Sequence, residues 1–244
     1  MAKNLTYAND LLKYFFNDAV PSYIQLLSSS NWTLNGWTGS FGAGFAAPGS
    51  TNALTNSLAA VSGQQYSINI IIVGQTAGTA TLTFGAQTST AYAASGAYAW
   101  LPTASSTATL SVTPTASFNG TVVFQNFGYY NYYVALHTAD PTTSGNQSSS
   151  EVTTGAYPGY ARVAVPSTSA GFTVTSNAVQ NTALVSFPVC LAGGSSPVIT
   201  YWSVGVLNAG AGEILYSGSV ASSLTVTTGL QPQFAAGTLT ATEA

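Results

Sequence analysis

The feature that most constrains this chain is a long segment without charge, because no lysine, arginine, aspartate or glutamate occurs between residues 21 and 127. Within it, short strand-like segments alternate with turn residues such as Pro48-Gly49-Ser50 and Asn119-Gly120. Residues 79–84 alternate in polarity with period two, as a strand with one buried face does. The segment therefore predicts a β-sandwich of jelly-roll type. Its expected strands are 32–37, 53–58, 65–73, 79–84, 96–101, 108–113 and 121–127.

The scarcity of charge excludes several functions. The whole chain has three basic and six acidic residues, so 4% of it is charged, against roughly a quarter in ordinary soluble domains. Three basic residues cannot follow a phosphate backbone or dock on an anionic bilayer, so we expect neither a nucleic-acid partner nor a membrane partner. Disorder is excluded because 46% of the residues are hydrophobic and net charge is low. Hydroxyl and amide groups must keep the surface soluble.

One helix is expected, at residues 5–19. Leu5, Ala8, Leu12, Phe15 and Ala19 recur at helical spacing and form an apolar stripe. Asn4 or Thr6 is placed to cap its start, and Pro21 to stop it. The first residues lack the unbroken apolar run of a secretory signal, which predicts synthesis in the cytoplasm.

The β pattern continues from residue 128, where charges return. The Ser/Thr-rich segment 142–154 is expected to be a mobile loop. Strands are expected at 132–137, 161–165, 172–175, 183–187, 198–207, 213–218, 223–227 and 233–240.

Two parts of the chain resemble known proteins. The first likeness lies in the helix at residues 1–13 and in the segments Tyr132-Tyr133-Val134-Ala135-Leu136-His137-Thr138-Ala139-Asp140-Pro141, 159–165, 185–188, 200–205, 215–218 and 234–240. Through these segments, residues 1–20 and 128–244 resemble a virion β-protein family of tailed bacteriophages, whose members are often labelled tail-fibre or head-decoration proteins.

In typical members of that family the helix is followed quickly by the Tyr-Val-Ala-Leu strand. Here the charge-free segment intervenes, which predicts a jelly roll of residues 21–127 inserted into a phage β-domain of residues 1–20 and 128–244. The inserted segment resembles jelly-roll modules of phage tail and fibre proteins, which are themselves similar to carbohydrate-binding sandwiches. This second likeness lies in Trp32…Gly36-Trp37, Ala47-Pro48-Gly49, Gly63-Gln64-Gln65-Tyr66 and Leu110…Pro114…Phe118-Asn119-Gly120.

Groups that could do chemistry are few. His137 stands three residues before Asp140, a spacing that offers a base and an orienting carboxylate, but Asp140-Pro141 is also a turn starter. The single cysteine, Cys190, is expected to be a buried apolar residue. No cluster of metal ligands is seen, so we expect no catalytic residue, no metal and no cofactor. A hydrolase using His137 and Asp140 is the third hypothesis after the two below.

The aromatic residues are the candidate binding groups. Tyr98, Trp100, Tyr129 and Tyr130 are predicted to contact a protein partner or a glycan, because Tyr and Trp are enriched at interfaces. Core packing is the alternative for Tyr98 and Trp100. Core positions are expected for Trp32, Trp37 and Trp202.

These observations predict a structural virion protein. The favoured hypothesis is a capsid decoration or cement protein, located on the capsid surface, whose partners are the major capsid protein and copies of itself. Wide, uncharged β-surfaces suit such contacts because little charge must be desolvated. The alternative is a tail-fibre or appendage protein whose jelly roll binds host glycans.

Overall fold

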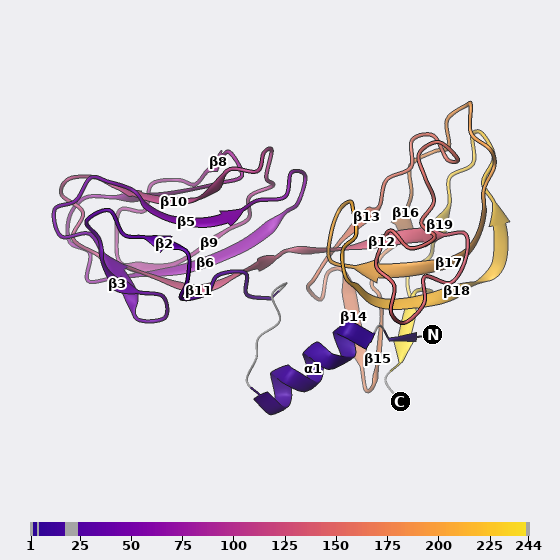
Figure 1. Ribbon diagram of the computed structural model, residues 1–244, viewed down its shortest axis with the longest axis horizontal. Helices are drawn as coiled ribbons and strands as arrows, with labels where there is room; N and C mark the ends of the chain where they lie inside the picture. The colour runs from indigo at the N-terminus through magenta and orange to yellow at the C-terminus, as the bar shows by residue number, and fades with distance from the viewer. Residues whose placement is uncertain (1, 4, 18–23, 243–244) are drawn as a thin grey trace. The chain divides into compact units, whose positions relative to one another are not determined.

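The computed structural model describes residues 2–3, 5–17 and 24–242, and it divides into two compact units. We call Val20–Tyr130 the sandwich unit, and Met1–Ala19 with Asn131–Ala244 the split unit. Figure 1 shows a β-sandwich in the first, and β-sheets with one helix in the second. The predicted all-β fold with a single short N-terminal helix is confirmed. That residues 21–127 are an inserted jelly roll stays a prediction.

The N-terminal segment is held on the split unit by several contacts. Strand β1 (Ala2–Lys3) pairs antiparallel with β18, and helix α1 spans Leu5–Asn17. The N–H of Leu5 donates to the carbonyl of Thr143 at 2.7 Å, and the rings of Tyr7 and Tyr216 meet edge to face at 5.3 Å. The predicted helix is confirmed over residues 5–17, whereas the predicted cap at Asn4 and end at Ala19–Pro21 lie outside the described residues.

The sandwich unit consists of two antiparallel five-stranded sheets. One has the order β2-β5-β10-β7-β8 and the other the order β3-β4-β11-β6-β9. From β4 onward the chain changes sheet at each main strand, except for the short β7–β8 hairpin. The strands are β2 (Trp32–Thr33), β3 (Thr38–Ser40), β4 (Gly44–Ala46), β5 (Leu54–Ala59), β6 (Tyr66–Val73), β7 (Ala80–Phe84), β8 (Gln87–Thr88), β9 (Gly96–Trp100), β10 (Thr109–Pro114) and β11 (Thr121–Tyr129).

Alternation along these strands forms the core of the sandwich unit. In β6, Tyr66, Ile68, Ile70 and Ile72 are each at most 2% exposed, while the residues between them are not buried. Each such side chain contributes about 1.5–3 kcal/mol by leaving water. Apolar residues of β7 and β10 face them from the other sheet. Trp37 is buried as predicted, whereas Trp32 is half-buried and packs on Phe45 with ring centroids 4.5 Å apart.

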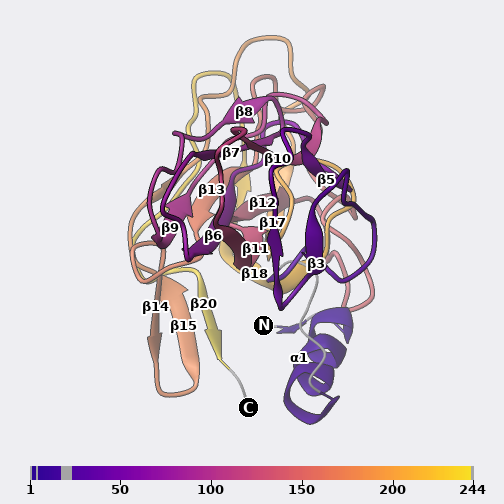
Figure 2. The same cartoon turned by 90° about the vertical axis from the view of Figure 1, so that its left-hand side faces the viewer.

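The split unit is built around one five-stranded antiparallel sheet, sheet A, of order β1-β18-β17-β12-β13. A three-stranded sheet of order β14-β15-β20 extends away from it (Figure 2). Trp202 and Cys190 lie in the core at 5% and 2% exposure, as predicted. The strands are β12 (Asn131–His137), β13 (Val163–Pro166), β14 (Phe172–Thr175), β15 (Ala178–Asn181), β16 (Val185–Ser186), β17 (Val198–Gly205), β18 (Ile214–Thr225), β19 (Gln233–Phe234) and β20 (Thr240–Thr242).

Three expectations for this unit were wrong. The two strands expected at 213–218 and 223–227 are one strand, β18, which pairs along its length with β17 through register shifts. Strand β15 was not expected, and it is stabilised by β14 on one side and β20 on the other. The segment 142–154 is not a mobile loop, because the side chain of Gln147 within it is fully buried and hydrogen-bonded.

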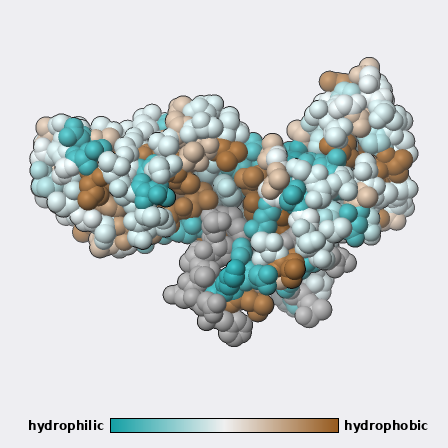
Figure 3. Space-filling view, viewed as in Figure 1, coloured by the Kyte–Doolittle hydropathy of each residue, from teal (hydrophilic) through white to brown (hydrophobic). Residues whose placement is uncertain are grey.

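The surface reflects the composition. In Figure 3 most of the visible face is of intermediate hydropathy, with scattered hydrophobic residues. Within residues 2–3, 5–17 and 24–242, no helix is long and apolar enough to cross a bilayer.

Candidate functional site

Tyr98 and Trp100, two of the four predicted contact residues, lie on one face of the edge strand β9. Strand β9 pairs with β6 in the register Ile70↔Tyr98 and Ile68↔Trp100. Directly opposed residues point to the same face of a sheet, so both aromatic side chains share the core-facing side with the two isoleucines. Each is partly buried against the core of the sandwich unit.

The two side chains differ in whether their polar group is available to a ligand. The hydroxyl of Tyr98 donates to the carbonyl of Ala94 at 2.7 Å, and its ring lies 4.4 Å from that of Tyr92. Burial raises the pKa of Tyr92. Among the described residues, the indole N–H of Trp100 donates no hydrogen bond. Trp100 therefore has the freer polar group.

Tyr129 and Tyr130 lie apart from this pair. Tyr129 ends β11, opposite Tyr66 of β6, and the two rings are 5.6 Å apart. Burial raises the pKa of Tyr129. Because β6 lies between β11 and β9 in the sheet, the structure does not bring the four predicted residues together. The backbone N–H of Tyr130 donates to the carbonyl of Gln65 at 3.0 Å.

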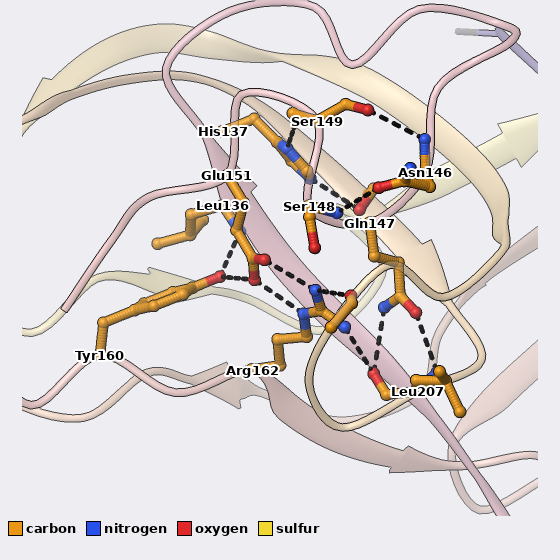
Figure 4. A network of polar contacts seen from close by, with 12 residues as sticks. Leu136, His137, Asn146, Gln147, Ser148, Ser149, Glu151, Tyr160, Arg162 and Leu207 are labelled. Atoms are coloured by element: carbon orange, nitrogen blue, oxygen red, sulfur yellow. Dashed lines mark hydrogen bonds and ion pairs between the residues drawn. The ribbon is translucent and has the colours of Figure 1, made fainter.

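The split unit contains a buried ion pair that fixes its loops (Figure 4). Nε and Nη2 of Arg162 donate to the two carboxylate oxygens of Glu151, each at 2.7 Å. The side chains of Arg162 and Glu151 are 2% and 16% exposed. The remaining guanidinium donors reach the carbonyls of Leu207 at 2.9 Å and Gly210 at 2.6 Å. The planar guanidinium group of Arg162 thus joins the carboxylate of Glu151 to the loop that contains Leu207 and Gly210.

Tyr160 extends this network to sheet A. Its hydroxyl donates to Oε1 of Glu151 at 3.0 Å and accepts the N–H of Leu136 at 3.0 Å. Burial, reinforced by the charge of Glu151, raises the pKa of Tyr160 strongly, so the phenol stays protonated and remains a donor.

Gln147 joins the same two loops through its amide. Its Oε1 accepts the N–H of Leu207 at 2.8 Å, and its Nε2 donates to the carbonyl of Leu207 at 3.2 Å. Its own backbone N–H donates to the carbonyl of Gly212 at 2.8 Å. The side-chain amide therefore pairs with the backbone of Leu207 as a residue of a neighbouring strand would. It lies against Gly205, where a side chain would collide with it.

His137, the predicted base, is part of the interior. Its Nδ1 lies 2.8 Å from the carbonyl oxygen of Ser149 and its Nε2 lies 2.8 Å from Oγ of Ser203. A carbonyl oxygen only accepts, so Nδ1 carries the proton and Nε2 of the neutral ring accepts from Ser203. Burial lowers the pKa of His137 and favours that neutral form. His137 and Ser203 are both 0% exposed, so this hydroxyl–imidazole pair is closed to a substrate.

Asp140, the predicted orienting carboxylate, makes a different contact. Its Oδ1 accepts the N–H of Thr142 at 2.8 Å in an exposed turn, and both ring nitrogens of His137 bond elsewhere. In the part of the chain that the structure describes, no group of three or more His, Cys, Asp or Glu side chains could hold a metal ion.

The environment of Glu213 disfavours the ionised form of its carboxyl group. Its Oε1 is buried, and no hydrogen bond to that atom is found among the described residues. Burial, followed by the nearby charge of Asp10, raises the pKa of Glu213 to about 7. Near neutral pH this group therefore exists in both protonation states.

Sequence reasoning missed the network of Glu151, Tyr160, Arg162 and Gln147. One signal could have found it. Arg162 is the only basic residue after the N-terminal helix, and a lone arginine in so uncharged a chain can be expected to be paired with one of the few carboxylates. The amide of Gln147 gave no comparable signal.

Comparison with known families gives a match that covers most of the split unit. Residues 129–242 match the family Gp80, described as Podophage GP4 fiber I protein gp80. The match begins at the end of β11, reaches β20 and includes the whole network, but it covers just under half of the chain. It supports a phage virion protein of the tail-fibre type. No curated protein matches the chain.

Proposed function

We propose that this protein is a structural component of the tail fibre of a tailed bacteriophage. The observation that carries the proposal is the match of residues 129–242 to a podophage fibre family. It favours the fibre hypothesis over the capsid decoration hypothesis, because the matched family is described as a fibre protein. The likeness of the N-terminal helix and of residues 128–244 to phage virion proteins points to the same particle.

The architecture of the split unit suits a mechanically rigid component. The buried pair of Arg162 and Glu151 ties two loops to each other, and Gln147 joins the same loops through Leu207. Tyr160 ties Glu151 to Leu136 of β12. Such a network favours a single arrangement of these loops, because leaving any buried polar partner unpaired would reduce the stability of the folded state. Rigid connection of elements is what a fibre component requires.

Imaging of the virion tests this proposal. Cryo-electron microscopy, or gold-labelled antibody against the sandwich unit, is expected to place the protein on the tail appendages in low copy number. Density repeated over the capsid lattice, with hundreds of copies per particle, would overturn the proposal and favour a cement protein.

Contact with host glycans is the second proposal, for the sandwich unit. The observation that favours it is Trp100, a partly buried indole at the edge of a sandwich with its N–H free among the described residues. Aromatic faces and uncharged polar groups suit neutral sugars. On a glycan array the wild type is expected to bind, Trp100→Phe, which keeps an aromatic face and loses the N–H, to bind more weakly, and Trp100→Ala to lose binding. Equal binding by folded Trp100→Ala, checked by thermal melting, would contradict it.

A further inference from the structure

Strand β9 is the longest edge strand in the part of the chain that the structure describes. It spans Gly96–Trp100, whereas the other outermost strands of the sheets have two to four residues. Edge strands expose unpaired N–H and C=O groups that can pair with another strand. Two of the other edges also carry a protecting residue, since β1 contains Lys3 and β13 ends at Pro166.

The usual protection of such an edge is absent from β9. Natural edge strands are blunted by lysine, proline, bulges or inward charges. The sequence Gly96-Ala97-Tyr98-Ala99-Trp100 has no charge and no proline, and its register with β6 is unbroken. No charged residue occurs anywhere from 21 to 127. Nothing in β9 therefore opposes pairing with a further strand.

The hydrogen-bond pattern shows which groups face outward. The N–H of Tyr66 donates to the carbonyl of Pro102 at 2.9 Å, so Tyr66 directs its peptide groups toward the β9 side. Alternate residues of a strand point their peptide groups to the same side, so Ile68, Ile70 and Ile72 also bond toward β9. Their partners are Trp100, Tyr98 and Gly96.

Ala97 and Ala99 consequently direct their N–H and C=O groups away from β6. Both alanines are exposed, and no backbone hydrogen bond to either is found from any described strand outside the β6 ladder. These are the free edge groups.

The edge is self-complementary about a two-fold axis through Tyr98. In an antiparallel pair of two β9 strands centred there, Ala97 faces Ala99 of the second copy and each pair exchanges both of its hydrogen bonds. Two small side chains meet at that position. Trp100 then lies opposite Gly96 of the second copy, where the absence of a side chain leaves room for the indole ring.

We propose that β9 pairs antiparallel with β9 of a second copy of this chain, joining the two β3-β4-β11-β6-β9 sheets into one. A second copy is the fitting occupant, because its edge is equally uncharged and two such edges approach without repulsion or loss of charge hydration. The proposal goes beyond the fibre function, and it holds or fails independently of it.

The paired strands form a small interface, below the area of standard stable dimers. Association is therefore expected at tens to hundreds of micromolar protein, strengthened where copies are held close together in a particle.

Sedimentation velocity of the full chain over that concentration range, without sugar or other virion components, tests the proposal. Wild type is expected to form dimers reversibly. Ala99→Lys places a charge on the edge, and Ala99→Pro removes an outward N–H that the β6 ladder does not use. Each is expected to weaken association at least about tenfold, which corresponds to about 1.4 kcal/mol.

Ala59→Lys is the matched control, because Ala59 is an exposed alanine of β5, an interior strand of the other sheet, and the change adds the same charge. It is expected to dimerise like wild type. Hydrogen exchange of the peptide containing Ala97 and Ala99 is expected to slow as protein concentration rises. A wild type that stays monomeric at several hundred micromolar, or dimers that persist in folded Ala99→Pro, would refute the pairing. Imaging of the virion does not bear on this result.

Discussion

Removal of the Arg162 guanidinium is the sharpest perturbation that the split unit offers. Arg162→Met keeps the apolar stem and removes every donor. Glu151 then loses both charge-assisted hydrogen bonds and keeps the hydroxyl of Tyr160. The carbonyl of Gly210 loses its guanidinium donor, while that of Leu207 still accepts from Gln147.

The size of the expected stability loss follows from the buried charge of Glu151, which this substitution leaves without a counter-ion. Breaking a buried ion pair by removing one partner typically costs about 3–5 kcal/mol. Glu151 retains 16% exposure and one hydrogen bond, which places the expected loss of unfolding free energy near the lower end, at about 3 kcal/mol. Adding Glu151→Gln removes the unpaired charge and keeps an acceptor for Tyr160. The double variant is therefore expected to recover about 1–2 kcal/mol of that loss.

Urea unfolding followed by pulsed hydrogen exchange and mass spectrometry measures the effect for each unit separately. Peptides of β12 and β17 are expected to unfold at lower urea, while peptides of the sandwich unit serve as an internal reference. Lys13→Met, which removes one positive charge from an exposed position of α1, is the control and is expected to change stability by less than about 0.5 kcal/mol. A loss below about 1 kcal/mol in Arg162→Met, or an equal loss in Lys13→Met, would show that the network does not stabilise the unit.

Two further predictions concern the same unit. The pKa of Glu213 in the folded protein, about 7, lies above its ordinary value of 4.5, so its ionisation penalises folding increasingly as pH rises from about 4.5 to 7 and fully above that. Because the group is partly exposed, solvent screening reduces this penalty to about 1 kcal/mol. Glu213→Gln is therefore expected to raise the free energy of unfolding by about 1 kcal/mol at pH 8 and to change it very little at pH 4.5. A difference in melting temperature that does not depend on pH would contradict the assignment. Gly205→Ala would place a methyl group 2.3 Å from Cδ of Gln147. It is expected to cost about 1–3 kcal/mol in urea unfolding and to speed hydrogen exchange in residues 142–151, whereas unchanged exchange there would show that Gln147 does not hold that loop.

The sequence predicts the sandwich unit better than the split unit for a physical reason. In the sandwich unit nearly every strand has one face on a single core, so polarity alternates as in Tyr66–Val73, and the turns carry their own signals. Strand β15 has no such alternation. It pairs with the neighbouring β14 and with β20, and no local pattern records the second partner, which lies some sixty residues later in the chain.

The predicted contact residues show the same limit. Tyr98 and Trp100 could be placed on one strand face from their spacing, but whether that face looks inward depends on the pairing with Ile70 and Ile68. The loop 142–154 looked mobile because its composition is that of a solvated loop. Its order comes from Arg162, Leu207 and Gly212, which contact it from distant positions.

The pairing of β1 with β18 has a consequence for synthesis. Ala2 and Lys3 lie opposite Ser217 and Tyr216, so more than two hundred residues must be translated between the two halves of this contact. At roughly 5–20 residues per second, the ribosome leaves the first strand without its partner for on the order of ten to forty seconds. The contiguous sandwich unit emerges within that interval and can fold first. Sheet A, whose pairings span the whole chain, then closes last, and its high contact order predicts that this closure is the slow step of folding.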